Sequence, residues 1–247
     1  MSILYVNNII PTTGSTITIN TGNNLSLGGT IISANTILPS ASGNTNKAVS
    51  TTGSAYQYST YGNASIAIFT ASNTWYKPAG VNTILVKLVG AGGGSSCHCE
   101  SGGAGGYAEA VIDVTSVSSV SITIGQGGGP TYYSGPAGQG GTTSFGSYLS
   151  ATGGNGANSN NQHHGGLPGL GSGGNFNNYG GGGTNHGQYN GRGGSSYFGG
   201  PGPSGHGNQY VATYKDYATP GAGASGGWPG EVGTYGSNGI CIVWEYR

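Results

Sequence analysis

Apolar and polar residues alternate along many short stretches of the chain, and this period of two is typical of half-buried β-strands. In the first quarter the runs are short, at 16–20, 25–27, 30–32 and 36–38, and Gly-Asn, Gly-Gly or Ser-Ala-Asn turns separate them. Stronger runs follow at 65–69, 83–89, 107–114, 120–124, 143–151 and 240–246. No window keeps a 3.6-residue period free of glycine or proline, so the pattern predicts an all-β protein.

Glycine divides the chain into two regions. Of the 55 glycines, 8 precede position 90. The apolar run at the C-terminus, 239–246, returns the chain to a β environment after the glycine-rich stretch. We therefore expect an antiparallel β-sandwich over 63–247 with a long glycine-rich loop insertion, whose loops occupy about 152–238.

The N-terminal region, 1–62, is expected to be a short-strand β stem that attaches and oligomerises. Strands this short bury little on their own, so they need an adjoining domain or further copies around a symmetry axis. The sequence therefore predicts an oligomer.

The glycines themselves restrict the possible structures. Ordering so many glycines costs backbone entropy, which close packing and hydrogen bonding must offset. A collagen triplet frame fits Gly171, Gly174, Gly180 and Gly183 but fails nearby at Asn177. Local packing of polyproline-II-like segments and compact loops both remain open.

The low charge of the chain argues against several classes of binding partner. Only 5% of the residues are charged and the formal net charge is zero, so we expect no nucleic acid partner and no binding to anionic membranes. The sequence shows no signal peptide pattern and no apolar run long enough for membrane insertion. The three cysteines, Cys97, Cys99 and Cys241, are too few for a disulfide scaffold and suggest assembly in a reducing cytosol.

Aromatic residues interleaved with Asn, Gln and Ser form a second pattern in the glycine-rich region. Rings supply contact area at low entropy cost and small polar residues supply hydrogen bonds, as in antibody binding loops. Such rings can equally fill a core. The candidate receptor-binding residues are Tyr132, Tyr133, Phe176, Tyr179, Tyr189, Tyr197, Phe198, Tyr210, Tyr214 and Trp228.

Several segments together resemble a known family. The segments 77–81, 84–94, 102–109, 122–125, 140–146 and 239–246, in this order, are similar to the glycine-rich domain of bacteriophage tail-fibre and virion structural proteins. The resemblance covers roughly 70–247, and more loosely the N-terminal third resembles the β stems of phage fibres. It implies a homotrimer or other oligomer in the virion, with variable loops that contact a host surface, and it implies no catalytic residues.

Metal and catalytic motifs are weak. Cys97, His98 and Cys99 are the nearest approach to a metal site, but zinc sites space their cysteines by two or more residues, so we expect no metal and no cofactor. The match of 223–227 to G-x-S-x-G lacks the strand and helix of a nucleophile elbow. No segment carries the paired carboxylates of a glycoside hydrolase, so we expect no enzyme, and polysaccharide depolymerase activity is the weaker alternative.

We therefore expect a receptor-binding phage tail fibre or fibre tip, assembled in the host cytoplasm. Region 1–62 would join other tail or virion proteins, and the Gly/Tyr/Asn-rich loops would bind a host surface glycan or outer-membrane protein. Rings stack on sugars and amides bond hydroxyls, but the sequence does not choose between these receptors. A purely structural virion component, such as a capsid decoration or a neck or baseplate fibre, is the main alternative.

Overall fold

The computed structural model divides into two compact units, Met1–Gly62 and Asn63–Arg247. In the first unit it describes the backbone of four short strands. In the second it describes residues 64–96, 99–131, 135–158, 164–185, 191–201, 219–227 and 233–246.

The first unit contains two antiparallel hairpins. Strand β1 (Asn24–Leu27) pairs with β2 (Thr30–Ser33), and β3 (Lys47–Thr51) pairs with β4 (Tyr56–Thr60). The runs predicted at 25–27 and 30–32 are therefore confirmed as strands. The runs predicted at 16–20 and 36–38 lie outside the described residues.

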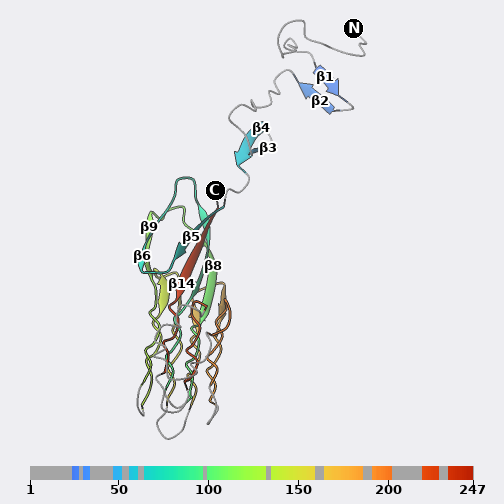
Figure 1. Ribbon diagram of the computed structural model, residues 1–247. Helices are drawn as coiled ribbons and strands as arrows, with labels where there is room; N and C mark the ends of the chain where they lie inside the picture. Colours follow the sequence, from blue (N-terminus) through green and yellow to red (C-terminus); the bar gives the residue numbers. More distant parts are fainter. Residues whose placement is uncertain are drawn as a thin grey trace, which may run out of the picture. The chain divides into compact units, whose positions relative to one another are not determined.

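The second unit is a sandwich of two antiparallel sheets, which confirms the all-β prediction (Figure 1). One sheet has the order β12 (Gly171–Ser172), β11 (Leu149–Ala151), β10 (Thr143–Phe145), β9 (Ser119–Thr123), β6 (Asn73–Tyr76). The other has the order β13 (Phe176–Asn178), β8 (Tyr107–Asp113), β7 (Thr83–Val89), β14 (Ile240–Tyr246), β5 (Ser65–Phe69). Every pairing in both sheets is antiparallel.

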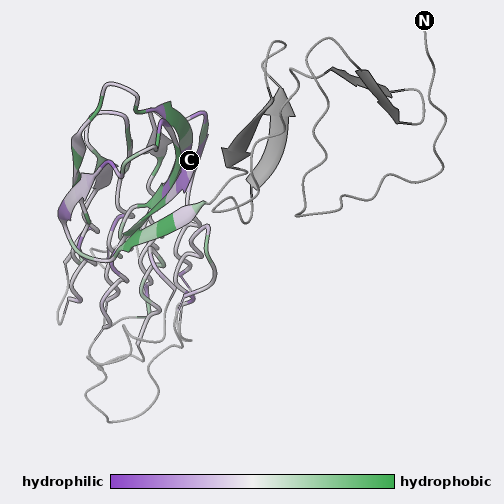
Figure 2. Cartoon of the chain, turned by 90° about the horizontal axis from the view of Figure 1, so that it is seen from above, coloured by the Kyte–Doolittle hydropathy of each residue, from purple (hydrophilic) through white to green (hydrophobic). Residues whose placement is uncertain are grey.

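Alternation along the strands places the hydrophobic core between the two sheets. In β7 the buried residues alternate with partly exposed ones, so Val86 and Leu88 face inward. Trp75 and Phe145, from the opposite sheet, pack in the same core. Their two ring centroids lie 5.9 Å apart. The strands are the hydrophobic part of this unit and the glycine segments below them are near neutral in hydropathy (Figure 2).

The glycine-rich sequence is not confined to one insertion over 152–238. It forms five excursions from the sandwich, two of which leave and return before residue 150, and β12 and β13 interrupt the rest. The difference arises because β12 and β13, which interrupt 152–238, are too short to stand out in the sequence, while the glycine segments 90–106 and 125–141 lie between strands that precede this range. The arms of the excursions are 90–96 and 101–106, 125–131 and 137–141, 152–158 and 164–170, 180–184 and 191–195, 221–226 and 233–239.

Backbone hydrogen bonds between the arms repeat every three residues. The amides of Gly90 and Gly93 donate to the carbonyl oxygens of Gly106 and Gly103 on the returning arm, at 3.0 and 2.9 Å. The next residue in each triplet donates to arm 137–141, and the third donates to arm 233–239. Three residues per turn is the repeat of a polyproline-II helix, which has no internal hydrogen bonds and must find partners on its neighbours. Of the two structures that the sequence left open, the arms therefore adopt packed, polyproline-II-like segments.

Two arms form the centre of this array, which we call the glycine lattice. Arm 90–96 exchanges backbone hydrogen bonds with six other arms, three as donor and three as acceptor, and arm 101–106 does the same. The two are neighbours and share arms 152–158 and 221–226 as neighbours. Two adjacent arms surrounded by the eight others correspond to hexagonal packing of ten rods. The lattice thus has a core of hydrogen-bonded backbone in place of hydrophobic side chains.

Glycine is required in the lattice because the arms approach each other too closely for a side chain. A Cβ atom on Gly92 would lie 1.9 Å from the carbonyl oxygen of Ala222, and one on Gly127 would lie 1.8 Å from that of Gly236. Such contacts force the backbone to move. The spacing between arms therefore explains the composition of this region.

Candidate functional site

The described ends of the arms at which the excursions reverse lie together at one end of the lattice. The first three excursions leave one sandwich strand and return to the next, and in all five the two arms pair in antiparallel register; Gly181 and Thr184, for example, donate to Ser195 and Arg192. The described arm ends beside the reversals therefore lie at the end remote from the sandwich, which we call the distal end. It is the end where loop sequences can vary without disturbing the lattice.

The first turn is built around a buried acid. The Glu100 side chain is fully buried, and its carboxylate accepts a hydrogen bond from the hydroxyl of Ser96. Cys99 precedes it in the left-handed region with φ 72°, which few residues other than glycine adopt. Its carbonyl oxygen accepts the amide of Gly191 at 2.9 Å, so this turn is tied to a neighbouring excursion.

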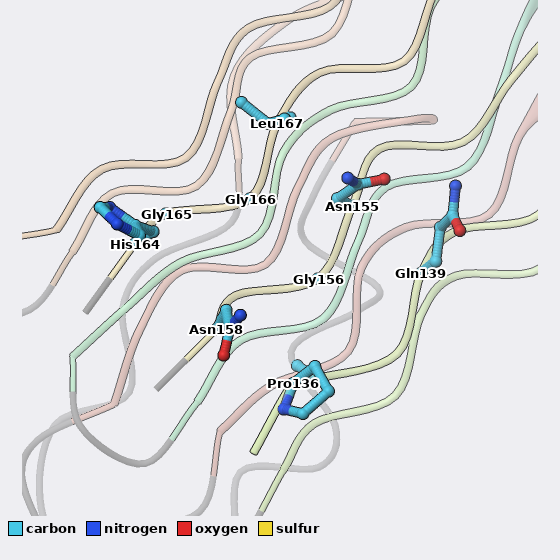
Figure 3. Close-up of a pocket in the computed structure, with 10 residues that line it drawn as sticks. Pro136, Gln139, Asn155, Gly156, Asn158, His164, Gly165, Gly166 and Leu167 are labelled. Carbon is cyan, nitrogen blue, oxygen red and sulfur yellow. The ribbon is translucent and has the colours of Figure 1, made fainter. Parts of the chain in front are cut away.

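A pocket of about 530 Å³ lies on one flank of the lattice towards the distal end. Arms 137–141, 152–158 and 164–170 form it, and their side chains line it from neighbouring traces (Figure 3). The lining mixes polar and apolar surface, with three amides, one imidazole and three apolar side chains. These are Gln139, Asn155, Asn158, His164, Pro136, Ala137 and Leu167.

An aromatic cluster lies at the opposite end of the lattice, where the first excursion returns to β8. The ring of Tyr197 stacks on the buried ring of Tyr107, with centroids 3.5 Å apart, while Phe176 and Phe198 meet Tyr107 edge-on at 6.1 Å. The Tyr107 hydroxyl donates to the Glu109 carboxylate at 2.5 Å. Burial, and then the hydrogen bond to Glu109, raise the pKa of Tyr107 well above its usual value. This cluster closes the junction between lattice and sandwich.

Comparison with known proteins adds the family. Residues 67–244, more than half of the chain, match the model of the glycine-rich domain family Gly_rich_2. The chain belongs to this glycine-rich domain family. No curated protein matches the sequence closely enough to report. The family therefore covers both the sandwich and the lattice, because its match begins in β5 and ends in β14.

The glycine-rich domain separates the predicted receptor-binding residues into groups. Phe176, Tyr197 and Phe198 come together in the aromatic cluster at the sandwich end, and Tyr179 follows β13 with 62% of its surface exposed. The remaining candidates, Tyr132, Tyr133, Tyr189, Tyr210, Tyr214 and Trp228, lie outside the described residues.

The chain beside these six positions is described. Thr131 and Gly135 flank the first pair at the distal end, and Gly191 and Gly227 lie next to the segments that hold Tyr189 and Trp228. By contrast, the segment with Tyr210 and Tyr214 begins and ends at the sandwich side, where the Thr219 hydroxyl donates to the carbonyl oxygen of Gly200 at 2.8 Å.

The structure describes one of the three candidate metal ligands. Cys99 is buried, and Cys97 and His98 lie outside the described residues. Among the side chains that the structure describes, no three of His, Cys, Asp or Glu come close enough together to hold a metal ion. The described part also contains no helix of the length and apolarity that a membrane span requires.

The residues of the flank pocket were not predicted from the sequence. The signal that could have found them is local spacing, since Pro136 and Gln139, Asn155 and Asn158, and His164 and Leu167 each stand three positions apart with only glycine or alanine between them. In a helix of three residues per turn, such positions project from one side. A triplet search restricted to short segments would have marked them as outward-facing.

Proposed function

We propose that this glycine-rich domain protein is the fibre or fibre tip of a bacteriophage tail and attaches the virion to a host-cell surface. The lattice serves as a rigid support and the distal turns serve as the recognition surface. The N-terminal unit would join other virion proteins and hold the chains as a homotrimer. The protein acts by binding, without a cofactor.

The observation that carries this proposal is that the described arm ends of five excursions meet at one end of a backbone-bonded lattice. Arms 90–96 and 101–106 each bond to six neighbours, so the ends of the arms are fixed relative to one another. A surface made of turns on a rigid support can change its side chains while the support remains folded. Receptor-binding proteins use this combination because it lowers the entropy cost of binding.

The candidate aromatic residues strengthen this assignment. Tyr132, Tyr133, Tyr189 and Trp228 fall in the sequence between the two paired arms of three excursions. A purely structural virion component needs no such residues in its turns. Aromatic side chains are the residue types that dominate binding energy in interfaces.

The test is a phage particle that carries the chain with Tyr132, Tyr189 and Trp228 replaced by Ser. We expect normal particle assembly and a large loss of adsorption to host cells, because the substitutions leave the lattice intact. Unchanged adsorption would contradict the proposal and favour the structural virion component. A particle in which Tyr76 and Tyr148, exposed residues of the sandwich, are replaced by Ser is the matched control and should adsorb normally.

A further inference from the structure

The flank pocket is lined by side chains that leave the lattice at three-residue intervals. Pro136 and Gln139 come from one arm, Asn155 and Asn158 from the next, and His164 and Leu167 from the third. All six are exposed, while Ala137, Ala157 and Gly166 between them are buried in the lattice. With a rise of about 3.1 Å per residue, residues three apart are separated by about 9 Å along the arm. The pocket is thus a regular array of outward-facing side chains.

The backbone beneath this array is fixed. The amide of Asn155 donates to the carbonyl oxygen of Leu167 at 2.8 Å, and the amide of Ala137 donates to that of Ala157 at 2.8 Å. Asn158 and His164 exchange two backbone hydrogen bonds at 3.0 Å. A Cβ on Gly156 would lie 2.2 Å from the carbonyl oxygen of Ala137, so the arms cannot separate or slide without loss of packing. The backbone positions from which the side chains project are therefore set before any ligand binds.

The chemistry of the lining selects the class of ligand. The amides of Gln139, Asn155 and Asn158 each offer both a donor group and an acceptor, which is the combination that a hydroxyl group, itself donor and acceptor, satisfies best. Leu167 and Pro136 offer apolar surface to C–H groups. We propose that this pocket binds a neutral saccharide. The proposal rests on the attachment function above, because that function is what brings the pocket to a glycan-bearing surface.

The lining argues against charged ligands. Within the part of the pocket that the structure describes, no lining residue carries a carboxylate, an ammonium or a guanidinium group. A phosphorylated or acidic sugar would lose its hydration without gaining a charged partner. A peptide is less favoured as well, because the arms that line the pocket already use their backbone groups in the lattice and offer few to an added strand.

The experiment is binding of the full chain to an immobilised panel of uncharged oligosaccharides and their sialylated or phosphorylated counterparts. We expect binding to one or more uncharged members, with affinity lowered about tenfold or more in the double variant Asn155→Ala, Asn158→Ala, since two hydrogen-bonding groups are lost. Gln126→Ala, which removes an exposed amide at the sandwich end, is the matched control and should bind as the parent does. Thermal unfolding of all variants checks that the lattice is retained.

Three outcomes would overturn the assignment. These are binding to charged members only, binding that the double variant does not weaken, and a ligand that proves to be a peptide. The two proposals fail in different ways. A chain that attaches to cells but binds no uncharged saccharide removes the saccharide site and leaves attachment in place. A chain that binds the saccharide through Asn155 and Asn158 but attaches to no cell keeps the site and removes the attachment function.

Discussion

A Cβ atom on Gly92 would lie 1.9 Å from the carbonyl oxygen of Ala222, although the two residues are far apart in sequence. Gly92 sits in a central arm of the lattice and its amide donates to Ser237 at 2.9 Å, so the arm cannot shift without loss of hydrogen bonds on several sides. This close approach shows why the chain uses glycine where other proteins use a hydrophobic core.

The first prediction concerns that contact. Gly92→Ala should lower the free energy of unfolding by about 3 kcal/mol or more, because the methyl group overlaps a backbone carbonyl. The measurement is urea denaturation of the purified chain. Gly182→Ala is the matched control, since the nearest atom to its Cβ would be 3.8 Å away, and it should change stability by less than about 1 kcal/mol. Equal losses in the two variants would contradict the lattice.

A second prediction concerns the buried carboxylate of the last strand. Glu245 accepts the indole N–H of Trp75 at 2.8 Å and the hydroxyl of Ser65 at 2.5 Å. Glu245→Ala leaves the buried indole N–H without its acceptor and should cost about 2 to 4 kcal/mol, whereas Glu245→Gln keeps one carbonyl acceptor and should cost less. Thermal unfolding compares the two. A Gln variant as unstable as the Ala variant would show that the hydrogen bond to Trp75 is not the source of the stability.

A third prediction concerns pH. The pKa of Tyr107 is raised above 10.0 in the folded state, mainly by burial and then by the hydrogen bond to Glu109. A raised pKa contributes stability that is fully present below pH 10 and is lost as the pH rises further, because the unfolded chain then releases the proton first. We expect Tyr107→Phe to reduce the fall in stability above pH 10. An unchanged alkaline profile would contradict this role for the Tyr107 hydroxyl.

A fourth prediction concerns the thiol of Cys241. Burial raises its pKa from 9.0 to about 12, so the reactive thiolate is scarce at neutral pH. Iodoacetamide should leave Cys241 unmodified in the native chain and should modify it in denaturant, as peptide mapping can show. Rapid modification of the native chain at pH 8 would mean that the end of the sandwich beside β14 opens readily.

The raised pKa of Cys241 also makes stability depend on pH. The contribution of the neutral thiol to the free energy of unfolding should be fully present below pH 9 and should be lost between pH 9 and about 12.

The sandwich could be predicted from the sequence to a large extent. Runs such as 83–89 and 240–246 are largely apolar over seven residues and appear in the structure as β7 and β14. The short strands β12 and β13 were not predicted, because two or three residues of Gly-Ser or Phe-Asn-Asn carry no recognisable period. Their pairing depends on neighbouring strands that bring them to the sheet edges.

The lattice could be predicted only as one of several possibilities. A collagen frame requires glycine at every third position over a long stretch, and Asn177 broke that frame because it lies in β13 and not in a lattice arm. The three-residue period is present, but each arm is only five to seven residues long. Which arms are neighbours depends on contacts between segments that are far apart in the sequence. These contacts cannot be recognised from a single sequence. The pocket residues were missed because the three-residue spacing that places them on one side of an arm is confined to these short segments.

The most direct test of the account is the binding of the purified full chain to candidate host cells, with Tyr132, Tyr189 and Trp228 replaced together by Ser in one variant and Tyr76 and Tyr148 replaced by Ser in the other. The account predicts saturable binding by the parent and by the sandwich variant, and at least a tenfold loss of affinity in the distal variant, with similar unfolding temperatures for all three. Equal binding by the two variants, or no saturable binding by the parent, would contradict it.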